Sequence, residues 1–127
     1  MGAHSLVAPA QQDRSGESIE VPIEPLSAIL EPGTPFVLFV DVEGFEPQVM
    51  RGGAAAIERD CRAIVLEVTP ARYSADDTLD LHRRISAFSS EFFLLASGER
   101  CLSRDLGILM AKRQHGQFNI ALLRGNP

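Results

Sequence analysis

The sequence predicts an α/β fold with about four main strands and flanking helices. Apolar runs rich in β-branched and aromatic residues cover 36–42, 63–69 and 118–123. Runs of this kind are typical of buried strands. Segments with helical spacing of apolar residues lie between them, at 47–59 and 75–89. This alternation of strands with helices indicates a sheet that is built at least partly from βαβ units.

The composition is that of a soluble globular protein with one domain. The chain has 127 residues, of which 45% are hydrophobic and 23% are charged. A net charge of −5 argues against nucleic-acid binding, which needs a basic patch. No apolar run is long enough to span a membrane, and residues 1–18 lack the pattern of a signal peptide. We therefore expect a cytoplasmic protein without nucleic-acid or membrane partners.

The N-terminal part is expected to contribute little to the main sheet. Residues 1–17 are polar and without periodicity, which predicts a loose lead-in. Residues 18–23 alternate polar and apolar side chains and predict a short strand or extended segment, which Pro22 confines to an edge. A short helix is expected at 25–30, ended by Pro32 and the glycine after it.

The run at 36–42 is the centre of the predicted fold. Because residues 36–40 are all apolar, we expect a strand buried on both faces, in a parallel sheet with helices on either side. The helix at 47–59 is expected to kink or divide at Gly52 and Gly53. The connection to the strand at 63–69 is long enough for a parallel, right-handed crossover.

The C-terminal part begins with a predicted helix at 75–89. Ser74 and Asp77 have the spacing of a capping box at its start. The remaining expected elements are a strand at 92–96, an irregular segment at 99–116 with a short helix or strand near 106–111, and a strand at 118–123.

Three acids mark the candidate site. Asp41 and Glu43 follow the first long strand, two residues apart, and in an extended chain they would point the same way. Glu67 lies near the carboxyl end of the next strand, where ligands bind in open α/β sheets. Three carboxylates there can act as a general base toward a hydroxyl or hold Mg²⁺. Alternatively, Asp41 and Glu43 cap the following helix and pair with Arg51 or Arg72 on a solvated rim. Spacing alone leaves both interpretations open.

Other chemistries find less support in the sequence. Cys61 and Cys101 are far apart and are expected to be free thiols, and the histidines have no metal-ligand spacing. The haloacid dehalogenase pattern requires two aspartates followed by Gly-Thr, whereas here Glu43 follows Asp41 and Phe45 stands in place of the threonine. A metal-dependent hydrolase is therefore the third hypothesis, behind the two given below.

The run from Val40 to Gly52 contains D-V-E-G-F-E, then a short helical segment and glycine. It resembles the signature of FkbM-type methyltransferases, D-V-E-G-x-E. The resemblance extends to 21–30 upstream, and to 64–67 and 119–123 downstream. It covers nearly the whole chain from about residue 18 and implies a Rossmann-like methyltransferase sheet, present here in part.

The resemblance implies O-methyl transfer from S-adenosylmethionine to a hydroxyl of a sugar, polyketide, glycolipid or similar secondary metabolite, with Mg²⁺ as a further ligand to consider. It makes 36–42 the fourth strand of the methyltransferase fold and places Asp41 and Glu43 beside the methyl group and the acceptor. One of these two would be the base or orienting group for the acceptor hydroxyl. Glu67 would be the supporting acid.

The chain departs from the family at the donor site. That site is built by a glycine-rich loop after the first strand and an acid after the second. The expected elements include no strand before residue 18 that could carry such a loop. Residues 18–127 therefore resemble the C-terminal half of the domain, without the half that binds the donor.

A half-domain of this kind would expose one edge of the strand at 36–42, and an open apolar edge favours association. We expect the chain to bind donor weakly or not at all, and to self-associate through this edge. The alternative function, from a different class, is a non-catalytic remnant or interaction module that binds a partner through the same edge.

Overall fold

The computed structural model describes residues 6–9 and 20–125. Its elements in chain order are β1 (Leu6–Pro9), β2 (Glu20–Ile23), α1 (Leu26–Ile29), β3 (Phe36–Val40), α2 (Glu46–Gly52), α3 (Ala54–Asp60), β4 (Cys61–Val68), the 3-10 turn η1 (Pro70–Arg72), α4 (Ala75–Phe88), β5 (Glu91–Leu94), β6 (Arg100–Leu102), the 3-10 turn η2 (Ser103–Asp105), α5 (Leu106–Lys112) and β7 (Phe118–Leu123).

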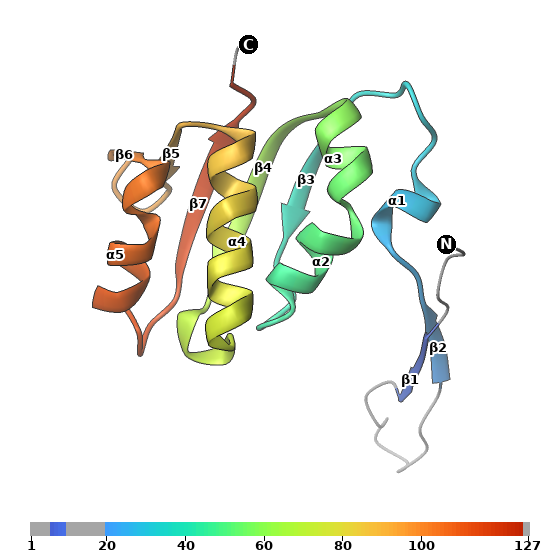
Figure 1. The fold of residues 1–127 in the computed structure, drawn as a ribbon, viewed down its shortest axis with the longest axis horizontal. Coiled ribbons are helices and arrows are strands. Elements are labelled where there is room, and N and C mark those ends of the chain that lie inside the picture. The colour runs from blue at the N-terminus through green and yellow to red at the C-terminus, as the bar shows by residue number, and fades with distance from the viewer. Residues whose placement is uncertain (1–5, 10–19, 126–127) are drawn as a thin grey trace.

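The main sheet has five strands in the order β3-β4-β7-β5-β6 (Figure 1). Strands β3 and β4 are parallel, as the predicted βαβ unit requires. Strand β7 lies between β4 and β5 in the sheet and runs antiparallel to both. Strand β6 pairs with β5 and runs antiparallel to it. The four predicted strands are thus all present, and β6 is an additional one. A separate two-stranded antiparallel sheet consists of β1 and β2.

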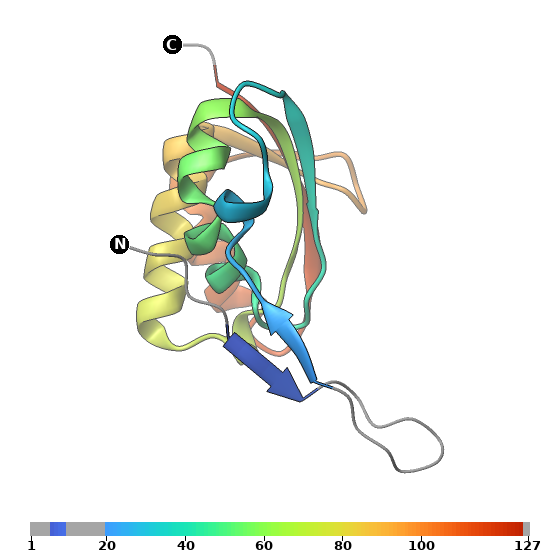
Figure 2. The ribbon, with the colours of Figure 1, turned by 90° about the vertical axis from the view of Figure 1, so that its right-hand side faces the viewer.

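The helices lie on one face of the main sheet, so the described residues form two layers (Figure 2). Our expectation that the first long strand is buried on both faces is therefore wrong. In β3, the side chains of Val37 and Phe39 are 55% and 75% exposed, whereas Val40 is 4% exposed. The apolar run is compatible with burial on both sides, but the described helices cover only the side that Val40 faces. The other side is referred to below as the open face.

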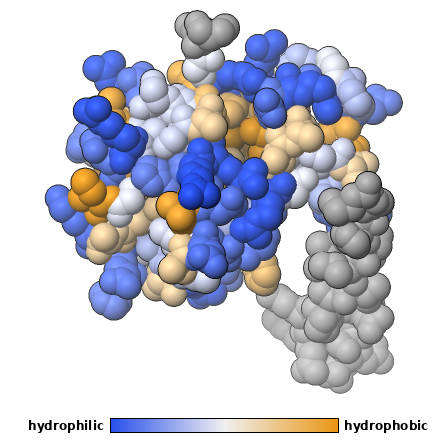
Figure 3. All heavy atoms as spheres, viewed as in Figure 1, coloured by the Kyte–Doolittle hydropathy of each residue, from blue (hydrophilic) through white to orange (hydrophobic). Residues whose placement is uncertain are grey.

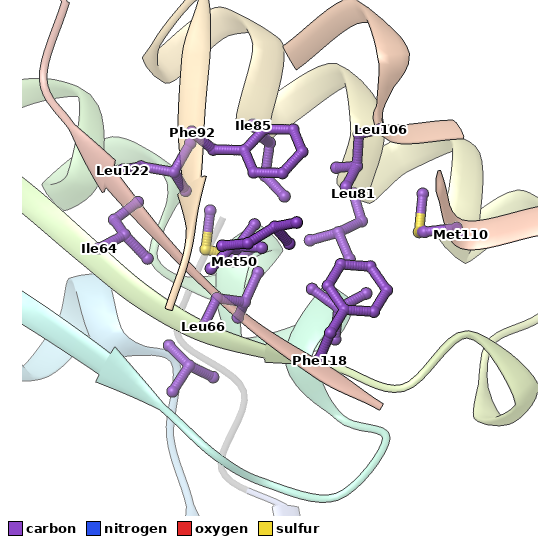
Figure 4. Packing of buried hydrophobic residues seen from close by; sticks show 14 of the residues in the cluster. Met50, Ile64, Leu66, Leu81, Ile85, Phe92, Leu106, Met110, Phe118 and Leu122 are labelled. Carbon is purple, nitrogen blue, oxygen red and sulfur yellow. The ribbon is translucent and has the colours of Figure 1, made fainter. Parts of the chain in front are cut away.

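The core fills the space between the sheet and the helices (Figure 4). Alternate residues of β4 and β7 point into it, because side chains alternate along a strand. They meet apolar residues from α2, α4 and α5. The largest fully buried apolar side chains are Phe92, Met50, Ile64, Leu66, Leu81, Ile85, Leu106, Met110, Ile120, Leu122 and Val68.

The side of the molecule shown in Figure 3, viewed as in Figure 1, carries mostly hydrophilic and intermediate residues, with some hydrophobic ones between them. This is the expected surface of amphipathic helices that bury one face against a sheet. Leu79 of α4 and Ile108 of α5 are 49% and 59% exposed and belong to the minority of apolar residues outside the core.

Several local predictions are confirmed. Helix α4 begins after Ser74, whose hydroxyl accepts a hydrogen bond from the N–H of Asp77 at 3.1 Å. The predicted helix at 47–59 divides into α2 and α3 at Gly53. Cys61 and Cys101 are free.

Two segments contain more regular structure than we expected. The lead-in at 1–17 includes strand β1, and the rest of that segment lies outside the described residues. The irregular segment at 99–116 includes β6 and η2 besides the short helix α5.

Candidate functional site

Two loops meet at the carboxyl ends of β3 and β4. The first, residues 41–45, joins β3 to α2 and is called the acid loop here. The second, residues 69–73, follows β4 and is called the clasp segment. Because β3 and β4 are parallel, both loops lie at the same edge of the sheet.

The acid loop is not an extension of the strand. Strand β3 ends at Val40, and Glu43 has φ 47°, in the left-handed region that non-glycine residues seldom adopt. Gly44 follows with φ 105°. Our argument that Asp41 and Glu43 point the same way because they are two apart in an extended chain is therefore wrong. Their relative placement is set by a tight turn, in which the N–H of Phe45 donates to the carbonyl of Val42 at 3.3 Å.

Glu46 is the buried centre of this region, with 0% exposure. Its Oε2 accepts a hydrogen bond from the N–H of Val42 at 3.0 Å, and its Oε1 accepts one from the N–H of Gly44 at 3.1 Å. Oε1 also accepts from the hydroxyls of Thr69 at 3.1 Å and Tyr73 at 2.6 Å. A buried carboxylate is tolerated where hydrogen bonds of this kind replace water. The sequence alone does not predict that the Glu46 carboxylate is buried.

The clasp segment packs directly on the acid loop. Nη1 of Arg72 donates to the carbonyl of Glu43 at 3.3 Å. The Arg72 side chain also covers Gly44 so closely that a Cβ there would lie 3.0 Å from its Cβ and Cδ. The hydroxyl of Tyr73 accepts from the N–H of Thr69 at 3.0 Å, and its pKa is raised by burial and by its bond to Glu46. Glycine is needed at 44 both for its φ and for this close approach.

Glu67 of β4 is half-buried beside the acid loop. Its pKa is raised above the ordinary value, first by burial and then by the negative charges of Asp41, Glu46 and Glu43. The structure thus brings Asp41, Glu43 and Glu67 close enough together for their charges to interact.

The alternative interpretation holds only in part: Asp41 and Glu43 are exposed, but among the described residues neither caps the helix nor pairs with Arg51 or Arg72. The N-cap of α2 is Phe45, and no side chain caps the helix. Arg51 pairs instead with Asp77 at 2.8 Å and Asp80 at 3.2 Å, on α4. Arg72 contacts the main chain of Glu43 rather than its carboxylate. Among the described residues, the salt bridges leave both acid-loop carboxylates free to face a ligand.

Asn119 is a site residue that the sequence did not single out. It is the cross-strand partner of Glu67, and both side chains lie on the open face because their strand neighbours are buried in the core. Directly opposed residues of an antiparallel pair are close enough to interact. Val65 lies two residues before Glu67 in β4 and belongs to a row of apolar residues on the same face. From β3 to β5, this row consists of Phe39, Val65, Ala121 and Phe93. Only the strand order could have revealed these neighbours.

The described residues form no metal cluster, and two cavities lie away from the acid loop. Within 6–9 and 20–125, no three His, Cys, Asp or Glu side chains converge in a way that could hold a metal. A cavity of about 390 Å³ is lined by residues of β5, β6, η2, α5 and the adjoining loops, and a second of about 210 Å³ by residues near the ends of β5 and β7. Neither includes an acid-loop residue. The acids therefore lie on an open edge rather than in a closed pocket.

The fold and this edge define an α/β protein of the Rossmann-like methyltransferase class, with its acids beyond the carboxyl ends of a parallel strand pair. The family model described as "Methyltransferase FkbM domain" matches residues 2–93. The chain belongs to this family. Neither the curated proteins nor the solved structures give a match. The matched span includes Asp41, Glu43, Glu46, Glu67 and Tyr73, and it begins upstream of the residue at which we expected the resemblance to start.

In the part of the chain that the structure describes, no helix is both long and apolar enough to cross a bilayer.

Proposed function

We propose that this chain is the acceptor side of an S-adenosylmethionine-dependent O-methyltransferase, which acts on a hydroxyl of a sugar or secondary metabolite. The observation that carries the proposal is the proximity of Asp41 and Glu43, which follow β3, to Glu67 at the carboxyl end of β4, in a chain of the FkbM family. The cytoplasmic location that we expected from the composition stays a prediction.

The acids have a plain chemical role toward such an acceptor. A hydroxyl is a weak nucleophile until a neighbouring group accepts its proton or a hydrogen bond from it. We assign this role to Asp41 or Glu43, with Glu67 as the supporting acid. The raised pKa of Glu67 supports its role as the supporting acid, because a carboxyl group with a raised pKa keeps its proton at a higher pH. The amide of Asn119 can bind a second polar group of the acceptor. Positioning of the hydroxyl is expected to contribute most of the effect.

The proposal is tested by nuclear magnetic resonance titration of the labelled chain with two hydroxyl probes, a methyl glycoside and a hydroxylated macrolactone. We expect at least one probe to shift the backbone signals of residues 41–46 and the carboxyl signal of Glu67. Glu67→Gln should weaken binding of that probe. Glu91→Gln, which removes a half-buried carboxylate of β5, is the matched control and should leave binding unchanged. Absence of shifts with both probes, or shifts confined to the cavity beside α5, would contradict the proposal.

A second candidate function rests on a different observation. Strand β3 is an edge of the main sheet, and Val37 and Phe39 are exposed beside that edge. Unpaired main-chain groups on an apolar edge strand favour pairing with another chain. We propose a second copy of this chain as the partner. In an antiparallel pair centred on Leu38, Val37 of each copy faces Phe39 of the other, a favourable β-branched–aromatic pair. The two Asp41 carboxylates then lie at opposite ends, which avoids their repulsion.

Light scattering over a range of concentrations tests this pairing. We expect a dimer that Phe39→Lys converts to a monomer, because a charge on an edge strand opposes pairing. Leu79→Lys, at a similarly exposed apolar position on α4, is the control and should leave the dimer intact. A chain that stays monomeric at all concentrations, or a dimer that Phe39→Lys leaves unchanged, would exclude this interface.

A further inference from the structure

Glu46 differs from the other acids of the site in that its carboxylate has no free position for a ligand. It is fully buried, and its oxygens accept from the N–H groups of Val42 and Gly44 and from the hydroxyls of Thr69 and Tyr73. Every partner is a donor, which is the pattern of an ionised carboxylate. Glu46 therefore cannot bind an acceptor hydroxyl without losing one of these bonds.

The donors come from two parts of the chain that are distant in sequence. Two are main-chain groups of the acid loop, and two are side chains of the clasp segment, 23 and 27 residues from Glu46. The Tyr73 hydroxyl also accepts a hydrogen bond from the N–H of Thr69, which stabilises the conformation of the clasp segment. Glu46 thus joins the acid loop to the clasp segment through four donors, in addition to the bond from Arg72 to the carbonyl of Glu43.

These bonds surround the strained residue of the loop. Glu43, with φ 47°, lies between Val42 and Gly44, and both of these donate to Glu46. A non-glycine residue persists in this conformation only where its surroundings hold it there. The direction in which Glu43 and Asp41 present their carboxylates therefore depends on bonds to Glu46.

We infer that Glu46, Thr69 and Tyr73 form a lock that positions Asp41 and Glu43 toward Glu67, and that Glu46 and Tyr73 are positioning residues of the acceptor site. The role in acceptor binding rests on the function proposed above. The lock uses hydroxyl and amide donors rather than Lys or Arg, so it orders the loop without a neutralising cation. The negative charge of Glu46 accordingly adds to that of the acid cluster, and it is one of the causes of the raised pKa of Glu67.

The test uses two variants that remove a hydroxyl without changing charge. In Tyr73→Phe and in Thr69→Val, we expect the amide protons of Val42 and Gly44 to exchange about tenfold faster, the effect of one weakened hydrogen bond. We also expect the titration midpoint of the Glu67 carboxyl to change. Thr78→Val is the matched control, since the Thr78 hydroxyl donates to the carbonyl of Ser74 within α4. It should leave both quantities unchanged. Glu46→Gln should have the largest effect, but the other variants keep the test independent of whether it folds.

Two outcomes separate the lock from the proposed function. If Tyr73→Phe and Thr69→Val lower stability but leave loop exchange and the Glu67 titration unchanged, the network only supports the fold and the inference is wrong. If both quantities change as expected, while neither hydroxyl probe binds the unaltered chain, the lock stands and the acceptor assignment fails.

Discussion

Glu67 illustrates how one residue can link the candidate site to stability. Its pKa is raised in the folded chain, so the folded state holds the proton more tightly than the unfolded state. The stability from this group is fully present below the unfolded pKa of about 4.5 and is lost as the pH rises through the raised folded pKa. Removal of the ionisable group should therefore matter most at neutral pH.

We expect Glu67→Gln to be more stable than the unaltered chain at pH 7, with a difference that shrinks as the pH falls toward 4.5. Urea unfolding at several pH values measures this. Asp80 is expected to show the opposite pH dependence, because its pKa is lowered in the folded chain. Burial alone would raise its pKa, but Arg84 and Arg51 lower it on balance, so Asp80→Asn should lose stability at neutral pH. Equal pH profiles for Glu67→Gln and the unaltered chain would contradict the described environment of Glu67.

Single residues also show where prediction from sequence ends. The proximity of Asp41, Glu43 and Glu67 follows from parallel strands that end at one edge, and the sequence predicted those strands. The burial of Glu46 does not follow, because it depends on Tyr73, which is 27 residues away and reaches the acid loop only in the folded chain. Asn119 was missed for a related reason. Its pairing with Glu67 depends on the insertion of β7 beside β4.

At the scale of elements, periodicity was most informative where an element packs on one side only. Helix α4 and strand β7 show clear spacing in the sequence, and both were predicted to within a residue. Strand β3 was located correctly, but its exposure was not predicted, because an uninterrupted apolar run gives no information about which face is covered. The segment around β6 and α5 consists of elements too short to produce a periodic pattern.

The connection between β3 and α2 gives a prediction at this scale. Gly44→Ala should be more destabilising than Gly98→Ala, although both glycines have positive φ, 105° and 74°. The backbone alone costs alanine about 1–2 kcal/mol at such positions. A Cβ at 44 would also lie 3.0 Å from the Arg72 side chain, whereas at 98 nothing lies within 4 Å. Thermal unfolding of both variants measures the difference.

The contribution of Arg72 can be separated by a double-mutant cycle. Arg72→Gly removes the atoms that crowd position 44, so part of the cost of Gly44→Ala should disappear in that background. If the losses of stability in Gly44→Ala and Arg72→Gly simply add in the double variant, crowding by Arg72 does not contribute to the cost of Gly44→Ala.

At the scale of the whole molecule, the main feature is a sheet with helices on one face and an edge strand that is open. The acids lie at the carboxyl ends of β3 and β4, and neither of the two cavities described above includes a residue of the acid loop. The family model shows that the chain is a relative of the FkbM methyltransferases.

We therefore expect calorimetric titration with S-adenosylhomocysteine to give no saturable heat, with or without Mg²⁺, on a folded sample of known mass. Saturable binding by a monomer would contradict this prediction, because it would require a donor site within one chain. Binding by a dimer alone would indicate that two copies complete the site together, and would connect the donor site to the β3 interface.

The position of β7 has a consequence for how the chain folds during its synthesis. Strands β4 and β5 are neighbours in the sheet only through β7, which leaves the ribosome after both of them. Until then, the hydrophobic strand β4 can pair only with β3, and β5 only with β6. The β7 strand then adds the pairings on both sides, and Arg124 directly after it donates to the carbonyls of Ile57 and Cys61. Strands β4 and β5 therefore each keep an unpaired edge until β7 has emerged, and apolar strands exposed in this way favour aggregation.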